Sequence, residues 1–475
     1  MAAATIVFLP YWASGHFMSM IESGKRMLGS SGGALSLTVL VMQAPTQAKA
    51  SEVEEHVRRE AASGLDIRFL RLPAVEPPTD YVAVEEFNFR YIQLHERQVA
   101  EAIAGLASPV AAIAVDLFCT PLLDVAREVA VPRYVYFAST GAFLALMLRL
   151  PALRGELLAA GPGEAEDTVD VPGLPPVPRP YMPACLASTK AKNYECFEYY
   201  GRRFMEASGI IVNSSVELEG GVLAAIADGR CVPGRPAPPV HAIGPVIWFA
   251  AREEPHPHKC VRWLDAQPPA SVVLLCFGSG GFFDEAQVAE VAAGLERSGH
   301  RFLWVLRGAP AAGSRHPTDA DLDAALPVGF LESTKDRGLV WPAWAPQKEI
   351  LAHPAVGGFV THCGWNSVLE SLWHGVPMVP WPLYGEQHLN AFELVAGMGV
   401  AVRLKEMDGG RFFVEAAELE RAVRGLMGGT AEGREAREKA AEAKAACRRA
   451  VAEGGSSHAA LRKLVREIVS PRARG

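Results

Sequence analysis

The sequence predicts an α/β protein of two doubly wound domains, with mostly parallel sheets that face a cleft. Short apolar runs alternate with amphipathic helical stretches along most of the 475 residues. Many of these runs are apolar at every position, as expected for strands that are covered by helices on both faces of a sheet. The alternation restarts after a proline-rich break, and the chain is long enough for two or three domains.

The first half begins with a βαβ unit. An apolar run at 5–10, a loop with Gly15, a stretch with apolar residues at helical spacing and a second apolar run at 35–42 follow one another. Further buried strands are expected at 111–116, 133–139 and 209–214. Residues 151–190, which are rich in proline and glycine, are expected to form a surface excursion.

The second half repeats the pattern after a proline-rich stretch at 233–258. Strands are expected at 271–277, 301–306, 338–341, 357–362 and 376–381, and helices at 284–298, 413–428, 431–453 and 456–470. We therefore place a first domain at 1–244, a linker at 245–259 and a second domain at 260–455. The last helix, at about 456–475, is expected to pack back on the first domain.

Composition excludes several classes of function. The formal net charge of −7 gives no electrostatic basis for binding nucleic acid or an anionic membrane. No apolar stretch reaches the length of a membrane span, and the N-terminus lacks the basic residues of a signal peptide. The eight cysteines are scattered without a C-x-x-C pair, which indicates reduced thiols. We expect a cytoplasmic, monomeric protein.

The stretch "FVTHCGWNSVLESLWHGVPMVP" at 359–380 brings two histidines and a cysteine close together in sequence. His362 and Cys363 are adjacent and point apart, and His374 follows only after a helix, so this spacing disfavours a tetrahedral metal site. A nucleophilic thiol at Cys363 is also disfavoured, because a small buried cysteine is the commoner case.

A strand, a glycine-containing turn and a helix explain the same stretch better. The helix would begin at about Asn366, and its N-terminal N–H groups and positive dipole end would favour an anion such as phosphate. Gly364 allows close approach of the backbone, while His362 and Ser367 add donors. Glu370, one turn later, could accept hydrogen bonds from ribose hydroxyls. A simple capped helix would explain Asn366 but not the whole set.

A second constellation lies in the first half. His16 follows Gly15 at the end of a strand, immediately before a helix whose N-terminus favours a neutral imidazole. Asp116 ends the buried strand at 111–116. Taken singly, each could be an incidental loop or capping residue. Together they could form a general base and the carboxylate that orients it.

Residues 344–387, "WAPQKEILAHPAVGGFVTHCGWNSVLESLWHGVPMVPWPLYGEQ", resemble the 44-residue signature box of plant UDP-dependent glycosyltransferases. These are inverting family 1 enzymes of the GT-B fold, which has two Rossmann-like domains. "GH" near the start and "CFGS" after the linker extend the resemblance over nearly the whole chain.

The resemblance implies a donor site in the second domain. The implied donor-binding residues are Ser279, Trp344, Ala345, Gln347, His362, Gly364, Trp365, Asn366, Ser367, Glu370, Tyr384, Glu386 and Gln387, and Thr140 is a further candidate from the first domain. Trp344 would stack on uracil, and Glu370 would hold the ribose. Trp365, Glu386 and Gln387 would contact the sugar. Many members have Asp where this chain has Glu386, and a terminal Gln resembles users of glucose more than users of galactose.

The implied reaction is inverting transfer of glucose from UDP-glucose to a hydroxyl of a small hydrophobic plant acceptor, such as a flavonoid or another phenolic. His16 would be the general base and Asp116 its support, with no metal or other cofactor. The candidate acceptor-binding residues are Trp12, Phe87, Phe118, Phe143, Met147 and Phe197, each of which could equally be a core residue. C-glycosyl transfer to a phenolic ring remains open.

The sequence also contains partial signals for three other functions. An NADP-dependent oxidoreductase would use "GSGGFF" and Arg307, but Phe283 occupies the third glycine position of the dinucleotide fingerprint. A serine hydrolase would use Ser279, but Phe277 stands where the nucleophile elbow needs glycine. A non-catalytic sugar-nucleotide-binding module would lack a base, and the candidate base with its carboxylate argues against it.

Overall fold

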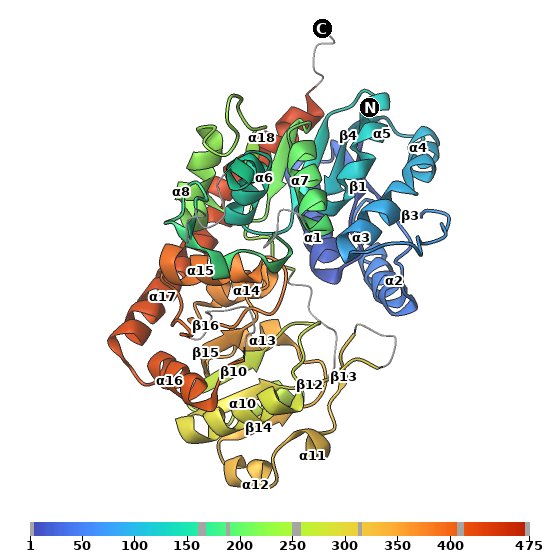
Figure 1. The fold of residues 1–475 in the computed structure, drawn as a ribbon. Coiled ribbons are helices and arrows are strands. Elements are labelled where there is room, and N and C mark those ends of the chain that lie inside the picture. The colour runs from blue at the N-terminus through green and yellow to red at the C-terminus, as the bar shows by residue number, and fades with distance from the viewer. Residues whose placement is uncertain are drawn as a thin grey trace. The chain divides into compact units, whose positions relative to one another are not determined.

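The computed structural model describes residues 4–159, 168–186, 191–248, 258–311, 316–405 and 413–470. The chain divides into two compact units (Figure 1). The first unit comprises Met1–Leu174, Cys185–Phe249 and Arg449–Gly475, and the second comprises Pro175–Ala184 and Ala250–Arg448. Among the described residues, no helix is long and apolar enough to cross a membrane. The expected cytoplasmic location and monomeric state stay predictions.

The first unit is built on a parallel sheet of seven strands in the order β3-β2-β1-β4-β5-β8-β9. Its strands are β1 (Ala4–Leu9), β2 (Leu35–Val41), β3 (Ile67–Arg71), β4 (Val110–Asp116), β5 (Arg133–Phe137), β8 (Gly209–Val212) and β9 (Val240–Ala242). The central strands are almost completely buried, as their unbroken apolar runs predict.

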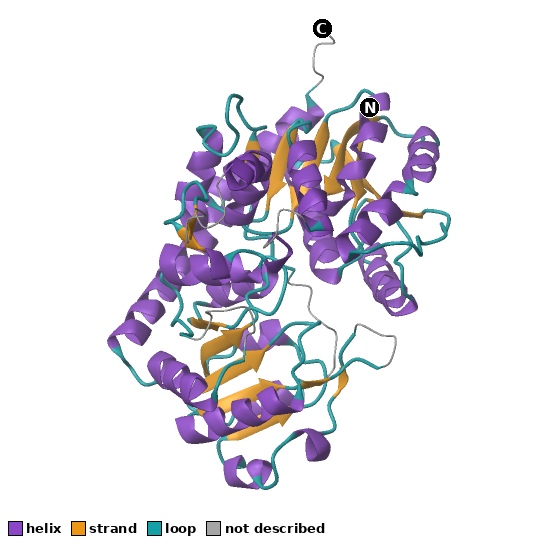
Figure 2. Ribbon diagram, viewed as in Figure 1, coloured by secondary structure: helices purple, strands orange, loops and turns teal. Residues whose placement is uncertain are grey.

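Helices flank this sheet (Figure 2). They are α1 (Ser14–Ser30), α2 (Gln47–Ala61), α3 (Val84–Gln93), α4 (Glu96–Ala104), η1 (Leu117–Leu122), α5 (Leu123–Glu128), α6 (Gly141–Ala159), α7 (Lys192–Phe204), α8 (Val216–Ala227) and α18 (Ser456–Val469). The C-terminal helix α18 packs on α1 and β9, and Ser457 donates a hydrogen bond of 2.5 Å to the carbonyl of Gly244.

The second unit contains a parallel sheet of five strands in the order β14-β11-β10-β15-β16. Its strands are β10 (Val272–Cys276), β11 (Arg301–Val305), β14 (Gly338–Trp341), β15 (Val356–Thr361) and β16 (Met378–Pro380). Its helices are α9 (Lys259–Leu264), α10 (Glu285–Ser298), α11 (Leu322–Ala325), α12 (Phe330–Thr334), α13 (Gln347–Ala352), α14 (Trp365–His374), α15 (Gln387–Phe392), η4 (Glu393–Gly397), α16 (Ala416–Met427) and α17 (Ala431–Val451).

Short elements complete the two units. They are β6 (Thr168–Val169), β7 (Val177–Pro178), η2 (Arg179–Tyr181), η3 (Ala184–Leu186), β12 (Arg307–Gly308) and β13 (Thr318–Asp319). The Tyr181 ring of η2 lies tilted against the Phe392 ring, with the centroids 5.3 Å apart, and its hydroxyl accepts a hydrogen bond of 2.9 Å from Arg403. These contacts explain why 175–184 groups with the second unit.

Both sheets have the same topology. Counted along the chain, the first five strands of each unit are ordered 3-2-1-4-5, so the strand order reverses between β1 and β4 and again between β10 and β15. In open parallel sheets, ligands bind beyond the carboxyl ends of the strands at such a reversal. The topology therefore predicts functional residues at the carboxyl ends of β1 and β4 and of β10 and β15.

The structure departs from the sequence-based predictions in several places. The strand expected at 133–139 ends at Phe137, and β3 and β9 were not predicted. The region read as an excursion from 151 begins with the last turns of α6, which continues through Pro151. Within the expected linker, Val246 is held to the first unit by both backbone hydrogen bonds to Asn213, while 249–257 lie outside the described residues.

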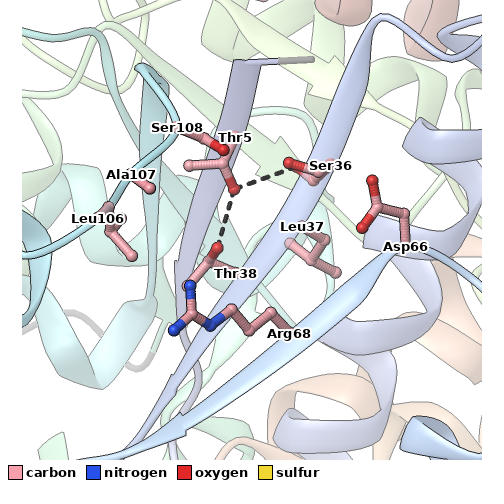
Figure 3. Close-up of a pocket in the computed structure, with 9 residues that line it drawn as sticks. All are labelled: Thr5, Ser36, Leu37, Thr38, Asp66, Arg68, Leu106, Ala107 and Ser108. Atoms are coloured by element: carbon pink, nitrogen blue, oxygen red, sulfur yellow. Dashed lines mark hydrogen bonds between the residues drawn. The ribbon is translucent and has the colours of Figure 1, made fainter. Parts of the chain in front are cut away.

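A cavity of about 220 Å³ opens at the opposite edge of the first sheet, beside the amino ends of its strands (Figure 3). The hydroxyls of Thr5 and Thr38 hydrogen-bond to each other at 2.9 Å in its wall, and Asp66 and Arg68 lie at its rim. Because ligands of parallel sheets bind at the carboxyl edge, this cavity is not the candidate functional site.

Candidate functional site

His16 and Asp116 meet at the strand reversal of the first unit. Asp116 is the last residue of β4, and His16 lies in the first turn of α1, which begins at Ser14 and not directly after His16 as predicted. His16 Nδ1 lies 2.9 Å from Asp116 Oδ2, although the residues are 100 positions apart in sequence. Because β1 and β4 are neighbours in the sheet, their carboxyl ends bring the two side chains together.

Asp116 is rigidly held. Its side chain is fully buried, and its second oxygen accepts a hydrogen bond of 3.0 Å from the backbone N–H of Phe118. Burial and the nearby charge of Asp116 raise the pKa of both Tyr11 and Cys119. A neutral His16 that donates Nδ1–H to this carboxylate carries its lone pair on Nε2, which is the tautomer a general base needs.

Aromatic rings surround His16. The ring centroids of Tyr11 and Phe118 lie 5.6 Å and 5.4 Å from the imidazole. Ring contacts join the predicted acceptor residues Trp12, Phe87, Phe118, Phe143 and Phe197 into one aromatic network that also contains Tyr11, Tyr91 and Tyr200. Met147 is completely buried and lies in the core. The sequence reasoning missed Tyr11, although it lies in the same loop as Trp12.

In the second unit, His362 follows β15 and lies between two glycines. A side chain carbon at Gly278, after β10, would lie 2.6 Å from His362 Nε2, and one at Gly364 would lie 2.5 Å from the same atom. Gly278 also has a φ of +72°, which favours glycine. Glycine at both positions therefore lets the imidazole ring fit into the strand reversal between β10 and β15.

His362 is neutral in this environment. The side chain is 7% exposed, and burial lowers its pKa to about 4. Its buried Nδ1 has no hydrogen-bond partner among the described residues. A neutral imidazole has one N–H to donate, and an unsatisfied buried nitrogen of this kind indicates a partner from outside the chain.

The turn after His362 leads into helix α14. Gly364 is the N-cap residue of this helix. Trp365, the first residue of α14, is 3% exposed, and its predicted contact with the sugar stays a prediction. With the first N–H groups and positive dipole end of a ten-residue helix beside His362, the turn is suited to an anion.

Gln347 connects two predicted donor residues on α14. Its Nε2 donates hydrogen bonds to Ser367 Oγ at 2.9 Å and to Glu370 Oε2 at 2.8 Å. Burial raises the pKa of Glu370 to about 7, against the opposing effects of Gln347 and Lys348. Glu370 lies one helical turn beyond Asn366 and keeps its proton to a higher pH than an ordinary glutamate does.

The remaining predicted donor residues follow the strands β10, β14 and β16 of the same sheet. Trp344, after β14, and Tyr384, after β16, are 47% and 49% exposed. Ala345 is buried, Ser279 is exposed, and Glu386 is the N-cap residue of α15. Gln387 is 4% exposed, and its Oε1 accepts hydrogen bonds from the backbone N–H groups of Leu383 and Tyr384.

Thr140, Phe283 and Arg307 make contacts within the protein, and the donor role of Thr140 stays a prediction. Thr140, in the first unit, is fully buried and accepts a hydrogen bond of 2.9 Å from the backbone N–H of Phe143 at the start of α6. Phe283 packs against Phe277 and Trp381, and Arg307 binds backbone carbonyls of the β12–β13 hairpin. Among the described residues, no group of three or more His, Cys, Asp or Glu side chains could hold a metal ion.

Comparison with known proteins identifies the family. Residues 234–429 match the family model described as UDP-glucoronosyl and UDP-glucosyl transferase. The chain is 59% identical to malvidin galactosylase UGT88C3 of Oryza sativa subsp. japonica, covering 99% of this chain and 98% of the relative. It is 38% identical to the anthocyanidin 5,3-O-glucosyltransferase of a Rosa hybrid cultivar, covering 98% of each chain.

A solved structure supports the same conclusion. Phytolacca americana UGT2 complexed with UDP-2fluoro-glucose and pterostilbene superposes with a TM-score of 0.85 and 34% identity, covering 98% of this chain and 100% of the other. The fold is therefore GT-B, and the resemblance of residues 344–387 to the signature box reflects true membership. The chain belongs to family 1 of the plant UDP-dependent glycosyltransferases, which act on flavonoids and other phenolics.

Proposed function

We propose that this enzyme transfers a hexosyl group, with inversion, from a UDP-hexose to a phenolic hydroxyl of an anthocyanidin-like flavonoid. The observation that carries the proposal is the 2.9 Å contact between His16 and the buried Asp116 at the strand reversal of the first unit. The likeness to relatives named for malvidin and anthocyanidin supports the acceptor class. The aromatic network around His16 suits a flat aromatic acceptor.

The proposed mechanism is a single displacement. His16 Nε2 removes the proton of the acceptor hydroxyl, and Asp116 stabilises the imidazolium that forms. The acceptor oxygen attacks the anomeric carbon as its bond to the diphosphate breaks, so UDP leaves with the electron pair. The α14 N-terminus and His362 would stabilise the charge of the leaving diphosphate, and the reaction would then need no metal ion.

Two observations bear on the donor sugar. The terminal Gln387 of the signature box favours glucose, but its Oε1 is held by two backbone N–H groups. That leaves the NH₂ group, which can donate to the C4 oxygen of either glucose or galactose. The 59% and 58% identical Oryza relatives are named malvidin galactosylase. We therefore place galactose first and glucose second.

The proposal is tested by competition. The enzyme is supplied with malvidin and equal amounts of UDP-galactose and UDP-glucose, and the product is identified by mass spectrometry and NMR. We expect an O-linked β-galactoside. A β-glucoside would establish the second donor, and a sugar bonded to ring carbon would establish C-glycosyl transfer. Failure to form a glycoside from any of a panel of phenols would refute the proposal.

Replacing Gly278 with alanine is expected to weaken UDP binding by about ten- to a hundredfold, the loss expected when a charged phosphate loses a well-placed hydrogen bond. The new methyl group would collide with His362, since a carbon there lies 2.6 Å from Nε2. Isothermal titration calorimetry with UDP measures the effect. Gly299→Ala is the matched control, because Gly299 has a similar φ of +71° but open space around it. Equal UDP affinity in the two variants would contradict the role given to His362.

Glu370 is expected to make stability depend on pH. Its pKa rises from 4.5 to about 7 on folding, so the folded protein holds the proton more tightly. Ionisation therefore destabilises the fold increasingly from pH 4.5 to pH 7, by at most about 3 kcal/mol and less because the side chain is partly exposed. Glu370→Gln should unfold at a higher temperature than the wild type at pH 8 and at the same temperature near pH 4.5. Thermal unfolding at both pH values measures this, and a pH-independent difference would contradict the raised pKa.

A further inference from the structure

The turn that joins His362 to Gly364 has an unfavourable backbone conformation. Cys363, between them, has a φ of +65°, in the left-handed region that is disfavoured for residues with a side chain. Its N–H donates to Thr361 Oγ1 at 3.2 Å, and its thiol donates to the Thr361 carbonyl at 3.4 Å. Burial raises the pKa of this thiol, so Cys363 stays protonated and acts here through its backbone.

The Cys363 carbonyl is held from a different element. Asn390 Nδ2 donates a hydrogen bond of 3.0 Å to it, and the Asn390 side chain is completely buried. Asn390 lies on α15, one helical turn beyond Gln387, and its own N–H bonds to the carbonyl of Glu386. One short helix therefore carries the sugar-contact candidates at its start and a clamp on the phosphate turn near its middle.

The hydrogen bond from Asn390 affects the positions of the His362 imidazole and of the first N–H groups of α14. Gly364 approaches His362 so closely that a side chain carbon would lie 2.5 Å from its Nε2. If Cys363 left the left-handed region, the direction of the chain at Gly364 would change. The imidazole and the first N–H groups of α14 would then no longer point at one anion.

We propose that Asn390 is a positioning residue for donor binding. Its amide holds Cys363 in the left-handed conformation, and this places His362 and the α14 N-terminus for the diphosphate. Because Asn390 and Gln387 lie on the same helix, the contact also fixes the position of the turn relative to Gln387. This inference rests on the proposed function, because it takes the turn at 362–364 to be the diphosphate site.

Asn390→Asp tests the hydrogen bond with almost no change in shape. The carboxylate cannot donate to the Cys363 carbonyl, whereas the Asn390 Oδ1 position keeps an oxygen. We expect the Kd for UDP and the KM for the UDP-sugar to rise about tenfold or more, the loss expected when a buried carbonyl loses its partner. The KM for the acceptor should stay within about twofold of the wild type, the scatter of a substitution that touches no acceptor contact.

Asn213→Asp is the matched control. Asn213 is also completely buried, and its Nδ2 donates to the backbone carbonyl of Val246 at 3.2 Å, but it lies in the first unit. We expect this variant to unfold at a lower temperature and to bind UDP as the wild type does. If Asn390→Asp lowers the unfolding temperature like the control and leaves the Kd for UDP unchanged, the proposal is overturned.

A compensating substitution separates positioning from general stability. Asn390→Ala removes the donor without adding a charge, and it also serves if Asn390→Asp fails to fold. Cys363→Gly relieves the strain of the turn, because glycine adopts positive φ without a steric cost. We expect Cys363→Gly to restore most of the UDP affinity that Asn390→Ala loses. No restoration in the double variant would overturn the role of the left-handed turn.

His362→Ala separates this inference from the proposed function. If the wild type does not bind UDP, or if His362→Ala binds UDP as the wild type does, the proposed diphosphate site fails. If His362→Ala weakens UDP binding while Asn390→Asp and Asn390→Ala do not, the diphosphate site stands and only the positioning role of Asn390 fails.

Discussion

His16→Ala is expected to lower kcat by about 10²–10⁴-fold, the range that a general base contributes, while the Kd for UDP stays unchanged. The imidazole is bound through Nδ1 to Asp116 at the strand reversal of the first unit, whereas the residues proposed to hold UDP belong to the second unit. The loss should therefore appear in the chemical step and not in donor binding. Steady-state kinetics with saturating UDP-sugar and calorimetry with UDP measure the two quantities.

Asp116→Asn sharpens the same prediction. The asparagine oxygen can still accept the N–H of Phe118, so its NH₂ group would face His16 Nδ1. His16 would then carry its proton on Nε2 and present no lone pair to the acceptor. We expect a kcat loss that approaches that of His16→Ala in a correctly folded protein. A kcat within tenfold of the wild type would show that the tautomer set by Asp116 is unimportant.

The chain offers a control for these two variants. His353 and Asp265 also form a histidine–aspartate contact, at 3.2 Å, but in the second unit and outside the candidate site. His353→Ala should leave kcat close to that of the wild type. If both histidine variants lost activity equally, the loss would reflect damage to the fold and not the removal of a base.

Glu219→Ala is expected to lower the free energy of unfolding of the first unit by about 3 kcal/mol or more, the sum of several unsatisfied buried donors. The Glu219 carboxylate is 3% exposed and accepts hydrogen bonds from Gly141 N and Ala142 N at 2.8 Å and from the Ser214 hydroxyl. The carboxylate therefore provides acceptors for the first N–H groups of α6, and the positive dipole end of this helix favours its negative charge. Removing it would leave these donors buried without an acceptor.

Chemical denaturation followed by circular dichroism measures this effect. Glu217→Ala is the control, because Glu217 lies in the same helix but is exposed, and its carboxylate accepts hydrogen bonds from the Ser456 hydroxyl. We expect the control to change the free energy of unfolding by less than about 1 kcal/mol, as exposed substitutions usually do. A similar small change for Glu219→Ala would show that water replaces the carboxylate at the α6 N-terminus.

Local sequence patterns predicted the strands that are buried on both faces. The runs at 5–10 and 111–116 correspond to β1 and β4, because unbroken apolar residues report burial between two layers of helices. The same reasoning missed β3, whose residues are only partly buried or exposed. It also missed β9, a three-residue edge strand within a proline-rich stretch. Half-exposed edge strands have no periodic signal strong enough to separate them from loops.

The site residues show the same limit. The strand, turn and helix of 359–374 predict an anion site, and the resemblance of 344–387 indicates the family that relatives of similar length confirm. Which side chains meet could not be predicted in this way. His16 contacts Asp116, His362 lies between Gly278 and Gly364, and Asn390 holds Cys363 because the order of strands in each sheet brings distant loops together. The periodicity of a segment indicates which of its faces is buried. It carries no information on which strand lies beside which in the sheet.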